Sequence, residues 1–105
     1  MPAERRYSVT VSPAAGERIH EHFMFLARVS ESAALRLLDT LMKDLRSLDR
    51  MPERNPRFER AHVPRGRYRY LLSARRYRIV YQIAGTDVHI EDIQDCRQSD
   101  DKSIV

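Results

Sequence analysis

Cysteine, lysine and glycine are all scarce in this chain of 105 residues, and each shortage excludes a class of site. The single cysteine, Cys96, cannot form a disulfide within the chain or a zinc site built from several thiolates. It agrees with a reducing compartment, so we expect a cytoplasmic protein. The three glycines are too far apart to form a glycine-rich phosphate-binding loop. We therefore expect no cofactor and no metal.

Long apolar runs are absent as well. No stretch approaches the roughly 18 apolar residues that a membrane span needs, so we expect no contact with a membrane. The first residues, MPAERRYSVTV, lack the apolar core of a signal peptide. Hydrophobic residues make up 42% of the chain and charged residues 32%, a balance typical of globular proteins. From this length we expect one domain over residues 1–105.

Arginine almost replaces lysine, and it is concentrated in one part of the chain. The chain has 17 arginines and two lysines. Residues 50–78 contain ten of the arginines and only two acids, Glu53 and Glu59, whereas residues 1–49 are balanced and residues 79–105 are acidic. A guanidinium can bind a phosphate through two hydrogen bonds and can stack on a base. The arginines therefore indicate a polyanionic partner, an acidic protein partner or a solvated loop.

Residue periodicity predicts the order strand, helix, helix, strand, strand, strand. A half-buried strand is expected over Arg6–Val11, followed by a helix that Ser12 caps and that ends near Val29. Residues 30–32 offer the next caps, beginning with Ser30, and a second helix follows that ends before Pro52. Its apolar positions are Ala34, Leu38, Leu41, Leu45 and Leu48. Residues 52–66 are expected to form a loop, and strands are expected over 67–72, 77–83 and 88–93. This order favours an α+β fold with a helical hairpin packed on an antiparallel sheet (β-α-α-β-β-β).

The turn between the second and third of these strands decides which side chains share a face of the sheet. A two-residue turn at Ala74-Arg75 pairs Tyr70 with Ile79 and Tyr68 with Tyr81. The large apolar side chains, among them all the tyrosines of these strands, then lie under the helices. Arg69 and Arg78 become neighbours on the opposite face. Such an arginine-bearing face suits a nucleic acid, an acidic protein segment or simply solvent.

The third of these strands also carries a family resemblance. The segment RRYRIVYQI, residues 75–83, resembles the RelE/ParE superfamily of toxins from bacterial type II toxin–antitoxin systems, and Tyr77-Arg78-x-x-Tyr81 is its most specific part. The resemblance covers nearly the whole chain and extends through Val88-His89-Ile90 to Arg97. It implies a small basic cytoplasmic toxin, of the kind used in plasmid stabilisation, that inhibits growth. A cognate antitoxin holds such a toxin inactive, and part of that antitoxin folds on binding.

The superfamily implies two alternative activities. RelE-like members cleave mRNA on the ribosome with the help of basic residues that stabilise the charge on the phosphate, whereas ParE-like members inhibit DNA gyrase. By position, Arg78, Arg69 and Arg97 would be the catalytic residues of a RelE-like enzyme. RelE-like enzymes also place a tyrosine near the C-terminus, and this sequence has none after Tyr81. The sequence thus favours gyrase inhibition, with an mRNA endoribonuclease, an inactive homologue and a non-toxic nucleic-acid-binding module as alternatives.

The remaining polar residues carry weaker predictions. His20 and His22 are two positions apart on a helix, which points them to different faces, so they do not form a metal pair. His89 is expected to be a surface histidine in the middle of a strand. Glu53 and Glu59 are expected to be ordinary loop charges rather than a general base. Cys96 has no second cysteine beside it and is predicted to be structural.

Overall fold

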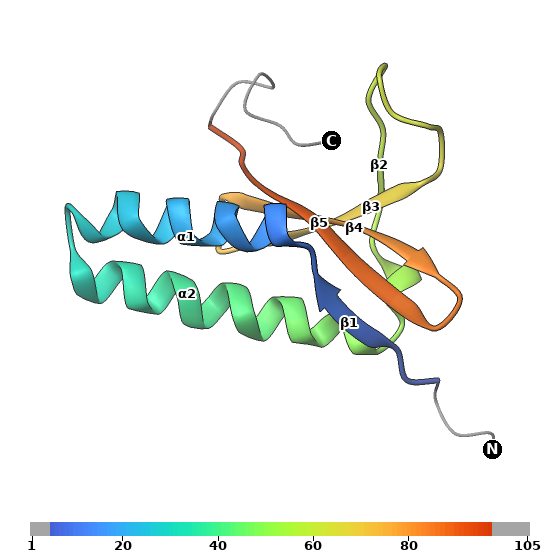
Figure 1. Cartoon of the computed structure of the whole chain (residues 1–105), viewed down its shortest axis with the longest axis horizontal. Helices are drawn as coiled ribbons and strands as arrows, with labels where there is room; N and C mark the ends of the chain where they lie inside the picture. Colours follow the sequence, from blue (N-terminus) through green and yellow to red (C-terminus); the bar gives the residue numbers. More distant parts are fainter. Residues whose placement is uncertain (1–4, 98–105) are drawn as a thin grey trace.

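The computed structural model describes residues 5–97, and Figure 1 shows two adjacent helices packed against a twisted sheet. The elements are β1 (Ser8–Val11), α1 (Pro13–Ala27), α2 (Glu31–Arg46), the short 3-10 helices η1 (Ser47–Asp49) and η2 (Pro52–Arg54), β2 (Arg57–Phe58), β3 (Tyr68–Ser73), β4 (Tyr77–Ala84) and β5 (Asp87–Asp95). The predicted α+β class with its helical hairpin is confirmed. Neither helix of the described part of the chain has the length and apolar character that a membrane crossing requires.

Both helices begin at the serines that the sequence indicates. Ser12 Oγ accepts a hydrogen bond from the backbone N–H of Ala15 at 3.0 Å, and Ser30 Oγ accepts one from Ala33 at 3.2 Å. Each bond satisfies one of the backbone donors that a helix start leaves free. The buried residues of α2 and η1 are Ala34, Leu37, Leu41, Leu45 and Leu48, so Leu37 takes the place predicted for Leu38, which is half-buried.

The sheet is mixed rather than wholly antiparallel. Its strand order is β1-β5-β4-β3-β2, and the antiparallel pairing of β3 with β4 and of β4 with β5 is as predicted. β1 instead lies parallel to β5, with Val9 beside Val88 and Val11 beside Ile90. The predicted loop also contains β2, which pairs with the start of β3. Periodicity reveals neither feature, because alternation gives no strand direction and β2 has only two residues.

The β3–β4 hairpin is shifted by one residue from the prediction. Its loop has three residues, 74–76, of which Ala74 and Arg75 adopt left-handed φ values of 52° and 59°. Leu71 therefore pairs with Ile79, and Arg69 pairs with Tyr81. A shift of one residue exchanges the two faces of a strand. The predicted placement of Arg69 and Arg78 on one face is thus wrong.

Because of this register, apolar side chains pack on both faces of the sheet. The face under α1 and α2, here called the helix face, buries Tyr77, Ile79 and Tyr81 together with the leucines of α2. On the opposite, far face, Tyr68 packs with Phe58 and Val80, and Val63 and Tyr70 lie beside them. Tyr77 and Tyr81 thus lie under the helices as predicted, but Tyr68 and Tyr70 do not. The far face is partly covered instead of being an open arginine surface.

Candidate functional site

Arg78 is the second residue of β4, on the far face, and is half-buried. Its Nε donates a hydrogen bond to Oε1 of Gln94, its neighbour on β5, at 3.2 Å. Its guanidinium carbon is 5.9 Å from the ring centroid of Phe58, and the guanidinium of Arg60 lies over the same ring at 4.6 Å. Stacking on an aromatic ring holds a guanidinium in place without neutralising its charge. Arg78 is therefore fixed in place by polar and aromatic contacts.

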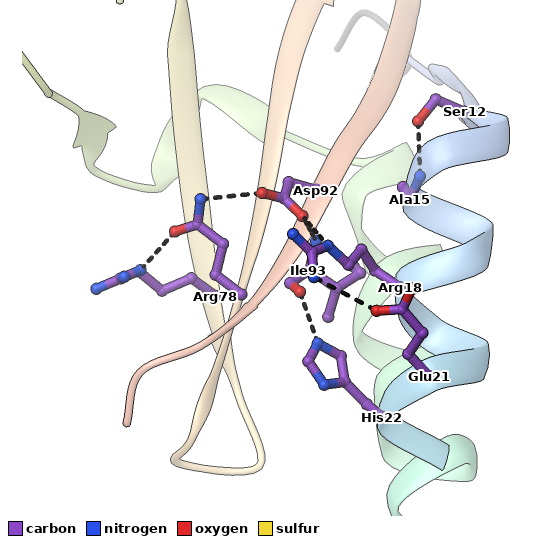
Figure 2. A network of polar contacts seen from close by, with 9 residues as sticks. Ser12, Ala15, Arg18, Glu21, His22, Arg78, Asp92 and Ile93 are labelled. Atoms are coloured by element: carbon purple, nitrogen blue, oxygen red, sulfur yellow. Dashed lines mark hydrogen bonds and ion pairs between the residues drawn. The ribbon is translucent and has the colours of Figure 1, made fainter. Parts of the chain in front are cut away.

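A chain of polar contacts connects Arg78 to helix α1 (Figure 2). Gln94 donates from Nε2 to Oδ2 of Asp92 at 3.0 Å, and Oδ1 of Asp92 accepts from the backbone N–H of Ile93 at 2.8 Å. Arg18 Nε is 3.7 Å from the same Oδ1, and Arg18 also contacts Glu21 at 3.4 Å. Asp92 has no exposed surface, so these partners are what allows its carboxylate to be buried. The orientation of Gln94, and through it of Arg78, depends on this chain.

Arg69 lies on the helix face and takes part in a different network. Its Nη1 donates to the backbone carbonyl of Asn55 at 2.7 Å, and Asn55 Nδ2 donates to the hydroxyl of Tyr81 at 3.0 Å. The Tyr81 hydroxyl in turn donates to the carbonyl of Pro52. Burial raises the pKa of Tyr81, although the hydrogen bond from Asn55 and the charge of Arg69 act in the opposite direction. Arg69 thus helps to fasten the η2 segment to β4.

Arg97 follows β5 and has a mostly exposed side chain whose Nε is 3.8 Å from Oδ1 of Asp95. Its backbone N–H donates to the same oxygen at 3.0 Å, and Arg76 donates to Oδ2 of Asp95 from Nε and Nη2 at 3.1 and 2.7 Å. Burial acts to raise the pKa of Asp95, but these hydrogen bonds outweigh it and hold that pKa below its ordinary value. Arg97 therefore lies beside a carboxylate that partly offsets its charge.

The three predicted site residues do not converge. Arg69 and Arg78 project from opposite faces of the sheet, and Arg97 lies beyond the end of β5, next to Asp95. One phosphate cannot touch the guanidiniums of Arg69 and Arg78 at the same time, because the sheet separates them. The structure therefore offers Arg78 and Arg69 as two separate cationic sites.

Sequence reasoning missed several residues around Arg78, including Asp92, Gln94 and Phe58. It also missed His22, whose Nε2 lies 2.7 Å from the carbonyl oxygen of Ile93 in a buried hydrogen bond. Cys96 is exposed, so its prediction as a structural residue is wrong. Within residues 5–97, no three His, Cys, Asp or Glu side chains are close enough to hold a metal ion. Arg18 and His22 are four positions apart and so share one face of α1, which is a sequence signal that could have indicated their contacts with β5.

Fold and site together define a small basic α+β protein with separate arginines on both faces of one sheet. A family model described as the ParE toxin of type II toxin–antitoxin systems, parDE, matches residues 9–99. The chain therefore belongs to the ParE toxin family, within the superfamily that its sequence resembles. A search among curated proteins found no match.

A solved structure shows the same architecture. Its title is "Chromosomal ParDE TA system from P. aeruginosa", and it is similar to 87% of this chain and 97% of its own chain with a TM-score of 0.70. The sequence identity is 14%, so the likeness concerns the fold.

Proposed function

We propose that this toxin acts as one domain over residues 1–105, stops growth by inhibiting DNA gyrase, and is neutralised by a cognate antitoxin. The observation that carries the choice of target is the separation of Arg69 from Arg78 across the sheet. Cleavage of mRNA by the RelE-like route needs several basic groups around one phosphate, together with an acid or base that moves the proton. Arg78 has Gln94 and Phe58 as neighbours and shares the Phe58 ring with Arg60. Arg69 lies on the opposite face, so two of the three predicted basic groups cannot act on the same phosphate.

The proposed antitoxin is a partner of the ParD type. The similar solved structure is titled as a ParDE system, and the matching family is described by the same pair. We expect the antitoxin to be encoded next to the toxin and to restore growth when the two are produced together. Toxin activity that persists in the presence of every neighbouring small protein would argue against a two-component pair.

The target is tested by pulse labelling in the first minutes after induction, with an amino acid and with thymidine in parallel. We expect incorporation of thymidine to stop first, while incorporation of the amino acid continues. A supercoiling assay with purified gyrase and relaxed plasmid should show the same inhibition without any cellular factor. An immediate stop in protein synthesis, with DNA synthesis spared, would overturn the proposal in favour of an mRNA endoribonuclease.

A further inference from the structure

The sheet has one strongly basic corner, formed by β2, the start of β3 and the loop between them. Residues 57–69, here called the arginine corner, contain one acid, Glu59, and five arginines: Arg57, Arg60, Arg65, Arg67 and Arg69. Figure 1 shows the loop between β2 and β3 projecting from the sheet, away from the helical hairpin. The corner is therefore reachable by a large partner without displacing α1 or α2.

The outer arginines of this corner carry net charge that their surroundings do not offset. Arg57, Arg65 and Arg67 are exposed, and no carboxylate in the described residues 5–97 lies within ion-pair distance of them. Arg57 also stands directly opposite Arg69 in the β2–β3 ladder. Like charges at directly opposed positions destabilise a pair of strands. An anionic partner would relieve this repulsion.

The backbone of the loop sets the position of Arg57. Gly66 has a left-handed φ of 74°, and a Cβ placed on it would lie 2.9 Å from Nη1 of Arg57. The absence of a side chain at Gly66 thus leaves room for the guanidinium to lie against the loop. This contact brings the charge of β2 next to the arginines on either side of Gly66.

The corner offers charge without an apolar anchor, and this points to a phosphate backbone. The exposed large hydrophobic residues of the described chain all lie outside residues 57–69, and Phe58 and Tyr68 are buried. Protein partners usually need an apolar or aromatic anchor at the centre of the interface. Single-stranded nucleic acids need several exposed rings on which successive bases stack, whereas Phe58 and Tyr68 are buried and His62 is a single exposed ring. Contacts to the phosphates of a duplex need only well-placed cations.

We propose that the arginine corner binds the phosphate backbone of double-stranded DNA directly and without sequence preference. This inference does not depend on gyrase being the target, because it concerns the toxin alone. Each arginine that neutralises one phosphate adds about 0.9 to the slope of log K against log salt. Arg57, Arg65 and Arg67 together should contribute about 2–3 to that slope.

The test is fluorescence anisotropy of the full-length toxin, freed of antitoxin, with a labelled 20-base-pair duplex at several NaCl concentrations. We expect a dissociation constant on the order of 1–100 µM, similar for two unrelated sequences. The triple variant Arg57→Gln/Arg65→Gln/Arg67→Gln should lower the salt slope by about 2–3 and weaken binding at low salt by about tenfold or more. Its circular dichroism should be unchanged, because all three side chains are exposed.

A control with the same net charge separates a defined site from bulk attraction. Arg28→Gln/Arg36→Gln/Arg46→Gln removes three exposed arginines from the helical hairpin and should retain the affinity within about twofold. Equal losses in the two triple variants, or unchanged binding by the corner variant, would overturn the proposal. Tighter binding to a single-stranded RNA than to the duplex would overturn it too. A corner variant that binds DNA normally but loses its antitoxin would assign these arginines to a protein partner instead.

Discussion

Asp92 is the residue on which the far-face network depends most. Its buried carboxylate accepts from Gln94 and from the backbone of Ile93 and faces Arg18. Replacing it with alanine removes the acceptor of Gln94 Nε2 and of the Ile93 N–H and leaves Arg18 with Glu21, an exposed partner. Removing one member of a buried charge pair costs about 3–5 kcal/mol.

We therefore expect Asp92→Ala to lower the free energy of unfolding by about 3 kcal/mol, measured by urea denaturation. Asp87→Ala is the matched control, because Asp87 lies exposed at the start of the same strand. The control should change stability by less than about 0.5 kcal/mol. Equal urea midpoints for the Asp92 variant and the parent would show that the network does not support the fold.

Ionisation of the Tyr81 hydroxyl makes the stability of the protein depend on pH in the alkaline range. Its pKa in the folded protein is raised above 10, the value expected in the unfolded chain, chiefly by burial. Its contribution is therefore complete below pH 10 and is lost as the pH rises from there through the folded-state pKa. Burial also raises the pKa of the Tyr77 hydroxyl.

We expect thermal stability to fall above pH 10, and we expect Tyr81→Phe to flatten that fall. At pH 7 the variant should be less stable by about 1–3 kcal/mol, because the carbonyl of Pro52 and the amide of Asn55 lose a partner. Melting curves between pH 7 and 11 measure both effects. An unchanged alkaline slope in Tyr81→Phe would assign the fall to other groups.

Arg78 tests the choice of target at the level of a single side chain. A gyrase inhibitor does not need this guanidinium to stabilise a scissile phosphate, so Arg78→Ala should remain toxic on induction if it folds. Arg78→Gln serves as a second variant, because it can still bond to Gln94 and preserve the far face. Complete loss of toxicity in both variants, with unchanged melting temperatures, would favour the endoribonuclease.

At the scale of elements, the β3–β4 loop decides how side chains are distributed between the two faces. Its three residues include Ala74 and Arg75 with positive φ, although neither is glycine. A left-handed conformation costs an ordinary residue about 1–2 kcal/mol, and Arg76 helps to offset this through its pair with Asp95. The loop is therefore held in a costly shape by a contact with β5.

We expect Ala74→Gly to stabilise the protein by about 0.5 kcal/mol, since glycine adopts positive φ freely but loses more freedom on folding. The melting temperature should rise by about 2–4 °C. Ala61→Gly, at an exposed loop position with ordinary backbone geometry, should lower it instead. A lower melting temperature for Ala74→Gly than for the parent would show that the left-handed shape is not a source of strain.

This loop also explains which part of the fold could be predicted from the sequence. Helix starts at Ser12 and Ser30 are local signals, and both are confirmed. The prediction that all large apolar side chains share one face was wrong. Tyr68 and Tyr70 instead pack on the far face beside Phe58, which belongs to the two-residue strand β2. Periodicity cannot reveal so short a strand, and no glycine or asparagine indicates positive φ at Ala74.

For the candidate site, too, the sequence predicted a residue but not the neighbours that it has in the structure. Arg78 is identified from the Tyr-Arg-x-x-Tyr segment, but its partners come from β5 and from the segment before β3. Those contacts depend on the bulge at Val80/Tyr81 and on the hairpin register, which only the folded chain defines. Residue identity was thus available from the sequence, whereas the face on which each arginine lies was not.

In the molecule as a whole, β5 is the strand that connects β1, at the start of the described chain, to the rest of the sheet. It lies between β1 and β4 and contributes Val88, Ile90 and Ile93 to the main core. We expect a chain that ends at Ala84 to be unfolded and harmless, because β1 and β4 then have no shared neighbour. Circular dichroism and growth after induction test this, and a toxic truncated chain would contradict it.

The parallel pairing of β1 with β5 determines when, during its synthesis, the toxin can fold. Ser8 and Asp87 are neighbours in the sheet, yet 79 positions of chain separate them. Contacts between such distant positions form late, because the long intervening loop must close first. A ribosome making this protein must therefore have translated the chain from β1 through β5 before the sheet can close. Translation that stops before β5 thus yields fragments in which this sheet cannot close, and an antitoxin meets the folded toxin only after β5 has been made.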